Sequence, residues 1–81
     1  MKLFYSSQFQ RSYDDAPAQI QKQCIKQIAL LKQDLRHPSL RAKKYDESRG
    51  LWQGRVNRNW RFYFVIDGDS YRMIDVMAHP K

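Results

Sequence analysis

The last third of the chain constrains the fold most, because it has the pattern of three β-strands joined by tight turns. Residues 51–56, 60–66 and 70–77 are rich in aromatic and β-branched side chains, which favour strands. Asn-Arg-Asn at 57–59 and Asp-Gly-Asp at 67–69 separate these runs, and Asn, Asp and Gly are residues that form tight turns. The sequence therefore predicts two consecutive antiparallel hairpins.

The register of the first hairpin follows from side-chain parity, since successive residues of a strand face opposite sides of the sheet. With a three-residue turn, Gly54 lies opposite Phe62 and Trp52 lies opposite Phe64, which gives one almost wholly apolar face. A two-residue turn would instead set Arg55 against Phe62 and mix charge into the core. We therefore expect the three-residue turn.

The same reasoning for the second hairpin sets Phe62 opposite Ile74 and Arg61 opposite Asp75. The apolar face then continues across all three strands and needs a covering layer. The other face is expected to stay open. The side chains gathered on it are Arg55, Arg61, Tyr63, Asp75 and His79.

An amphipathic helix before the strands supplies the covering layer. Its apolar residues recur at steps of three and four, which is the period of one helix face: Ile20, Cys24, Ile28, Leu31 and Leu35. Its polar residues, Gln27 among them, are assigned to the solvent side, and Pro38 ends the helix. This stripe most simply packs on the apolar face of the sheet.

The remaining segments complete the predicted order β-α-α-β-β-β. Residues 2–5 form a short strand-like run, Ser6 or Ser7 opens a first helix, and residues 39–50 form a polar connection. We therefore expect an α+β fold in which a helical hairpin packs on one face of a small antiparallel sheet. A length of 81 residues fits one domain spanning 1–81.

Charge and cysteine content narrow the classes of function. The net charge of +7 points to an anionic partner, and residues 41–61 hold seven lysines and arginines against two acidic residues. The single cysteine, Cys24, excludes a disulfide framework and argues against a zinc cluster. The sequence has neither a signal peptide nor a membrane-length apolar run, so we expect a cytoplasmic protein that does not contact membranes.

The segment from Gly50 to Phe64, followed by a strand that ends near His79, resembles a known family. The motif RVNRNWRFYF at 55–64, together with the terminal histidine, is similar to the RelE/ParE superfamily of bacterial toxins from type II toxin–antitoxin systems, and most similar to its HigB/YoeB-like branch. The resemblance implies the same compact α+β fold, a cognate antitoxin and a toxin–antitoxin hetero-oligomer. It also implies a ribosome-dependent endoribonuclease that cuts mRNA and needs no metal or other cofactor.

The resemblance also assigns roles to residues. By position, Arg61 matches the arginine that opens the central strand, His79 matches the histidine that transfers protons, and Arg55 matches a basic residue near the scissile phosphate. A ribonuclease of this kind needs an acid, a base and cations at the phosphate. The residues expected to bind RNA or the ribosome are Lys43, Lys44, Arg49, Arg58, Tyr63 and Lys81.

Two alternatives stay open. ParE-like members of the superfamily poison DNA gyrase instead of cutting mRNA. HigB- and YoeB-like nucleases usually carry a tyrosine beside the histidine, where this chain has Ala78 and Pro80. The sequence is therefore also compatible with an inactive member that binds RNA or the ribosome without cleaving, and it leaves open which residue would work beside His79.

Overall fold

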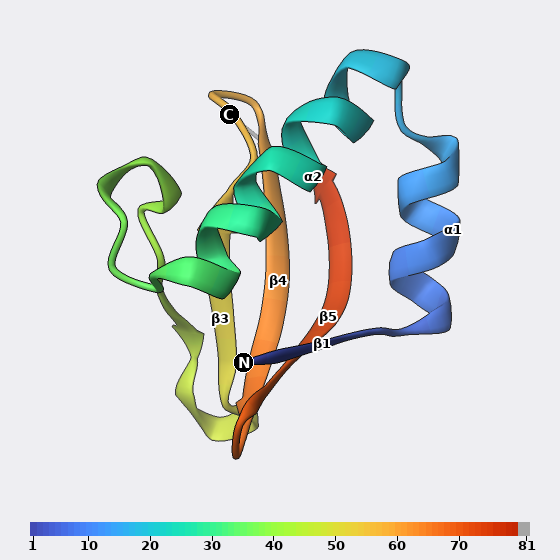
Figure 1. Ribbon diagram of the computed structural model, residues 1–81. Helices are drawn as coiled ribbons and strands as arrows, with labels where there is room; N and C mark the ends of the chain where they lie inside the picture. The colour runs from blue at the N-terminus through green and yellow to red at the C-terminus, as the bar shows by residue number, and fades with distance from the viewer. Residues whose placement is uncertain (80–81) are drawn as a thin grey trace.

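Residues 1–79, which the computed structural model describes, form a five-stranded sheet and two α-helices (Figure 1). The strands are β1 Lys2–Tyr5, β2 Lys43–Asp46, β3 Leu51–Arg55, β4 Trp60–Asp67 and β5 Ser70–Ala78. The helices are α1 Ser7–Asp15 and α2 Ala18–Gln33, and two short 3-10 turns follow them, η1 Pro38–Leu40 and η2 Glu47–Arg49. The expected α+β class is confirmed.

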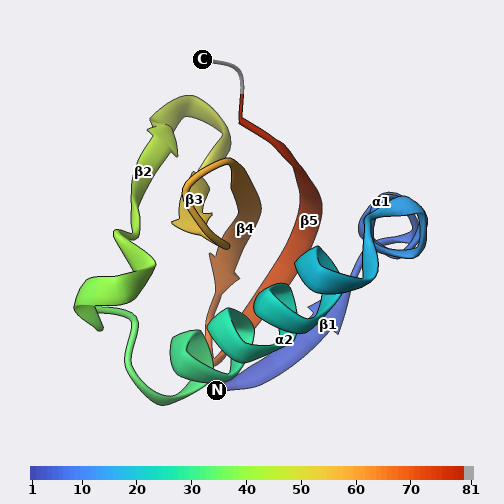
Figure 2. The same cartoon turned by 90° about the horizontal axis from the view of Figure 1, so that it is seen from above.

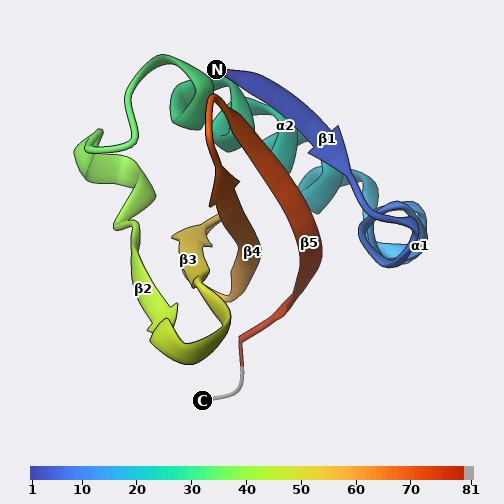
Figure 3. The same ribbon diagram turned by 90° about the horizontal axis from the view of Figure 1, so that it is seen from below.

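The strand order across the sheet is β1-β5-β4-β3-β2. β1 runs parallel to β5, and the other neighbours are antiparallel, so the sheet is mixed. Views at right angles to Figure 1 show β1 and β2 at opposite edges of the sheet, with α2 crossing the sheet between them (Figures 2 and 3).

The segment 39–50 departs from expectation, because it is not simply a connection. It contains η1, η2 and the edge strand β2, which pairs Lys43 with Gln53 and Lys44 with Trp52. β2 has the sequence KKYD and is exposed along most of its length. Alternation of apolar and polar residues is the signal of a half-buried strand, and this exposed edge strand does not carry it.

The first hairpin has the predicted register. Gly54 lies opposite Phe62 and Trp52 lies opposite Phe64. The side chain of Asn57 closes the three-residue turn, because its Oδ1 accepts the backbone N–H groups of Asn59 and Trp60 at 2.8 and 3.0 Å. This is the turn geometry for which asparagine is suited.

The predicted register of the second hairpin is wrong. Phe62 lies opposite Val76 instead of Ile74, and Arg61 lies opposite Met77 instead of Asp75. The turn is tighter than expected: Asp67 and Ser70 pair directly around a glycine with a φ of 60°. A β-bulge between Tyr63 and Phe64 on one side, and 73 and 75 on the other, then shifts the register again.

The bulge decides which side chains of β5 enter the core. Met73 and Val76 are both buried although they are three positions apart in the strand, and Ile74 is half-buried. A β-bulge leaves one residue outside the ladder. Here Ser6 supplies hydrogen-bond donors to the β5 carbonyls beside the bulge. Its backbone N–H donates to the Met73 carbonyl at 2.9 Å, and its Oγ donates to the Ile74 carbonyl at 2.7 Å.

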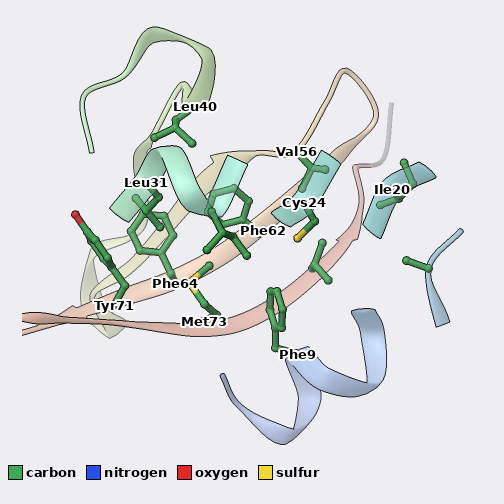
Figure 4. Close-up of a cluster of buried hydrophobic side chains, with 13 residues drawn as sticks. Phe9, Ile20, Cys24, Leu31, Leu40, Val56, Phe62, Phe64, Tyr71 and Met73 are labelled. Carbon is green, nitrogen blue, oxygen red and sulfur yellow. The ribbon is translucent and has the colours of Figure 1, made fainter. Parts of the chain in front are cut away.

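One hydrophobic core joins both helices to the sheet (Figure 4). The α2 stripe buries Ile20, Cys24, Ile28 and Leu31 as predicted, and Phe9 enters from α1. Burial raises the pKa of the Cys24 thiol to about 11. The neutral thiol therefore packs in the core as a small hydrophobic residue does. No helix within residues 1–79 is long and apolar enough to span a bilayer.

Gln27 of α2 does not lie on the solvent side as predicted. It is 8% exposed and shares the buried face of the helix. A buried amide must find partners for its polar atoms. Gln27 finds them in two chain segments beside the end of β3, where the candidate site lies.

Candidate functional site

Basic side chains gather at the end of the sheet where β3 turns into β4. Arg55 closes β3 and lies opposite Arg61 of β4, and Arg58 lies in the turn between them. β5 ends at the same end of the sheet (Figure 1). His79 follows β5, and its backbone N–H donates to the Asn59 carbonyl at 2.6 Å. The three residues assigned to catalysis, Arg55, Arg61 and His79, are thus brought to one end of the fold.

These arginines point away from the helices. Gly54 and Phe62 lie on the core side, so their neighbours Arg55 and Arg61 face the open side of the sheet. A second cross-strand row lies next to this pair and faces the same way. It consists of Lys43, Gln53, Tyr63 and Asp75.

Arg61 is fixed by its own turn. Its Nη1 donates to the backbone carbonyls of Asn57 at 2.7 Å and Trp60 at 3.0 Å, with a longer contact to Arg58 at 3.3 Å. The guanidinium therefore closes the β3–β4 turn and is held in one orientation by it.

Asp75 does not neutralise this end of the sheet. Its Oδ1 accepts the backbone N–H of Val76 at 2.8 Å. The ion pairs of residues 1–79 are Arg49 with Asp46 and Arg72 with Asp67, and neither includes a basic residue of this site.

The environment of Arg55 disfavours its positive charge. Partial burial lowers its pKa below the usual arginine value, and the positive charges of Arg41, Arg61 and Arg58 lower it further. Arg41 was not among the residues selected from the sequence, because the strand that brings it here, β2, was not recognised. The register of β2 on β3 was the information required to find it.

Tyr63 is less accessible than expected for a residue that stacks on a base. It is 7% exposed, and the ring of Tyr45 packs edge-on against it at 5.0 Å between centroids. Burial raises the pKa of the Tyr63 hydroxyl, and Tyr45 and Asp75 raise it as well, against an opposing effect from Arg61. At neutral pH the hydroxyl is a hydrogen-bond donor.

Two further residues predicted to bind RNA, Lys44 and Arg49, are not brought to this end. Lys44 lies opposite Trp52, whose side chain packs against the core, so it faces the helix side of the sheet. Arg49 pairs with Asp46 at 2.8 Å in the 3-10 turn before β3, at the opposite end of that strand. Lys81 lies outside the described residues.

The opposite end of the sheet collects acidic residues. Asp67 ends β4 and Asp69 lies in the β4–β5 turn, and Asp46 and Glu47 lie where the chain enters β3. Hydrogen bonds from Ser48 and then Arg49 lower the pKa of Asp46, so this carboxylate stays ionised. Within residues 1–79, His, Cys, Asp and Glu side chains do not form a group of three that could hold a metal ion.

A family model described as a ParE-like toxin domain matches residues 18–81, a range that contains every basic residue of the candidate site. No curated protein sequence matches the chain. Solved structures share the fold at low sequence identity. They include a YoeB/ParE toxin from Agrobacterium tumefaciens, with a TM-score of 0.82 and 17% identity, covering 99% of this chain and 100% of that chain.

Two further structures extend the likeness across bacteria and archaea. YafQ from Escherichia coli strain BL21(DE3) has a TM-score of 0.79 and 17% identity, covering 95% of this chain and 91% of that chain. The archaeal RelE–RelB complex from Pyrococcus horikoshii OT3 contains a chain with a TM-score of 0.80 and 8% identity, covering 99% of this chain and 96% of its own. At these identities the structures establish a shared fold.

Proposed function

Because this chain belongs to the ParE-like toxin domain family, within the RelE/ParE superfamily of toxin–antitoxin toxins, we propose that it is a toxin that cleaves mRNA on the ribosome. The observation that carries the proposal is that Arg55, Arg61 and His79 lie at one end of the sheet and that, within residues 1–79, neither arginine is paired with a carboxylate. Such an end is suited to a phosphodiester and supplies one group that can transfer protons.

Each residue has a role in the proposed reaction. The 2′-hydroxyl of the RNA loses its proton and attacks the adjacent phosphorus, and the bond to the 5′-oxygen breaks as that oxygen gains a proton. His79 either accepts the proton of the 2′-hydroxyl or donates the proton to the 5′-oxygen, and solvent water exchanges the other proton. Arg55 and Arg61 stabilise the charge that develops on the phosphate oxygens, and the carbonyl contacts of Arg61 keep its guanidinium in place before the substrate arrives.

His79 is exposed, which suits a role on a large partner. Its backbone is held at the β3–β4 turn by Asn59, and its imidazole lies at the surface. On the ribosome, rRNA would position the message against this surface and exclude part of the water around it. Neither a metal nor another cofactor is required by this mechanism.

A second candidate is a toxin that poisons DNA gyrase. The observation that favours it is the ParE-like character of the matching family model. The absence of a tyrosine beside His79 favours a third candidate, a member that binds RNA or the ribosome without cleaving. Both candidates use the same basic surface. They differ from the first in that neither requires His79 to transfer a proton.

The partners follow from the family. The P. horikoshii relative was solved as a RelE–RelB complex. We propose that this chain also has a cognate antitoxin that inhibits it and that the two form a hetero-oligomer. We further propose that residues 1–81 form a single toxin domain and that the complex is cytoplasmic.

The test is brief induction of the toxin, followed by primer extension on a cellular mRNA. Wild-type protein is expected to cut the message at codon boundaries. His79→Asn keeps a polar side chain and removes the proton-transfer group, so cleavage is expected to fall about 10²- to 10⁴-fold.

Lys26→Gln is the matched control, because it alters an exposed residue of α2 outside the site. It should cut as the wild type does. Intact message together with DNA damage signalling would favour gyrase as the target. Full cleavage by a folded His79→Asn protein would remove His79 from the mechanism.

A further inference from the structure

Gln27 joins the two chain segments that flank the basic end. Its Nε2 donates to the Ser39 carbonyl in η1 at 3.1 Å and to the Arg55 carbonyl at the end of β3 at 2.8 Å. The Ser39 hydroxyl also lies 3.5 Å from the Oε1 of Gln27. This one buried amide therefore sets the spacing between η1 and the last residue of β3.

The pairing of β2 with β3 carries Arg41 to the same place. Lys43 lies opposite Gln53, and the strands are antiparallel. Continuing this register, two residues before Lys43 and two residues after Gln53, sets Arg41 beside Arg55. Arg41 adopts a left-handed backbone with a φ of 45°, where the chain turns from η1 into β2. Its side chain is exposed.

Arg41 extends the existing pair into a row. Arg41 lies two residues before β2, and continuing the β2–β3 register sets it in a row with Arg55 and Arg61, with Arg58 in the adjacent turn. Like charges placed opposite one another on a sheet repel, and the ion pairs of residues 1–79 lie elsewhere. Of the charges that lower the pKa of Arg55, that of Arg41 contributes most. A polyanion lying along the row would relieve this repulsion.

We propose that Arg41 is a further phosphate-binding residue of this site and that Gln27 is the positioning residue that holds it beside Arg55. The ligand is the backbone of single-stranded RNA, whose successive phosphates follow the row of guanidinium groups. The choice of RNA rests on the proposed function.

The experiment measures binding of a single-stranded 2′-O-methyl RNA oligonucleotide by fluorescence anisotropy over a series of salt concentrations. This probe binds but is not cleaved, because it lacks the attacking hydroxyl. Arg41→Asn removes the charge, and asparagine tolerates the left-handed backbone. We expect about tenfold weaker binding, and a slope of log affinity against log salt that is smaller by about 0.7.

Lys26→Gln is again the control, since it removes one positive charge from the solvent face of α2. It should leave the salt slope close to that of the wild type. Equal slopes and affinities for Arg41→Asn and Lys26→Gln would overturn the assignment of Arg41.

The role of Gln27 is tested with Gln27→Met, which keeps the length of the side chain and removes its hydrogen bonds. Because Gln27 acts through Arg41, the variant should weaken binding in the wild-type background and have little effect when Arg41→Asn is already present. A loss of the same size in both backgrounds would mean that Gln27 only supports the fold, and the positioning role would then be withdrawn.

The two proposals fail separately. Intact mRNA after induction, combined with oligonucleotide binding that depends on Arg41, would refute cleavage and support the assignment of Arg41. Cut mRNA, combined with normal binding by Arg41→Asn, would do the reverse.

Discussion

At the scale of single residues, the sequence predicts for β3 and β4 which face a side chain takes, but it does not predict which neighbours that side chain has. Alternation placed Arg55 and Arg61 on the open face, and the structure agrees. It could not show that Arg61 contacts the carbonyls of its own turn, because that depends on how the turn is closed. It also missed Arg41, whose position is set by a strand without apolar alternation.

Gly54 is the residue on which the first hairpin most depends. The ring of Phe62 packs directly over it, and a Cβ at this position would overlap the ring. Gly54→Ala is therefore expected to lower the free energy of unfolding by about 1 to 3 kcal/mol, because Phe62 is fully buried and has little room to move. Chemical denaturation measures the change.

Gly68 provides the comparison for this prediction. It has a positive φ, and a Cβ there would meet open space. Gly68→Asn should cost less than Gly54→Ala, since asparagine tolerates the left-handed conformation. A change of less than about 0.5 kcal/mol for Gly54→Ala would contradict the tight packing of Phe62 over Gly54.

At the scale of elements, β1, β3, β4 and β5 were predictable from the sequence, whereas β2 and the register of β5 were not. A bulge and a two-residue turn together moved Asp75 from Arg61 to Tyr63. The reason is physical: the bulge is stabilised by Ser6, which is distant in sequence and whose role becomes visible only when β1 and α1 are in place. The sequence left open whether Ser6 or Ser7 opens α1, and the structure assigns this role to Ser6.

Ser6 and Ser7 are a matched pair for testing this arrangement. The Ser6 hydroxyl accepts the backbone N–H of Phe9 at 2.9 Å and donates to the Ile74 carbonyl, whereas Ser7 is exposed. Ser6→Ala should lower the free energy of unfolding by about 1 to 2 kcal/mol, because it removes a helix cap. Ser7→Ala should change it by less than about 0.5 kcal/mol. Equal effects in thermal or chemical denaturation would contradict the assigned cap.

At the scale of the whole molecule, the fold separates charges that are mixed along the chain. Arg49 and Arg58 are both arginines of the basic segment 41–61, and the sequence alone treats them alike. In the structure Arg58 lies at the basic end, and Arg49 lies at the acidic end in an ion pair with Asp46. Net charge therefore predicts an anionic partner, and the sheet topology determines where it binds.

This separation predicts different results for two equal changes in charge. Arg58→Gln should weaken binding to single-stranded RNA and reduce the salt slope by about 0.7. Arg49→Gln should alter neither by more than the measurement error, although both variants lose one positive charge. Titration of a labelled 2′-O-methyl oligonucleotide at several salt concentrations measures both. Equal losses would indicate a diffuse attraction instead of a local binding surface.

The parallel pairing of β1 with β5 has a consequence for the order in which the molecule assembles. Ser6 and Ile74 are 68 residues apart, so their contact closes a loop that includes most of the chain. Closure of so long a loop is entropically unfavourable until the intervening hairpins have already condensed. β1 is thus expected to dock late in folding and to detach early in unfolding. While β1 is detached, the edge of β5 is unpaired and its backbone amides exchange with deuterium.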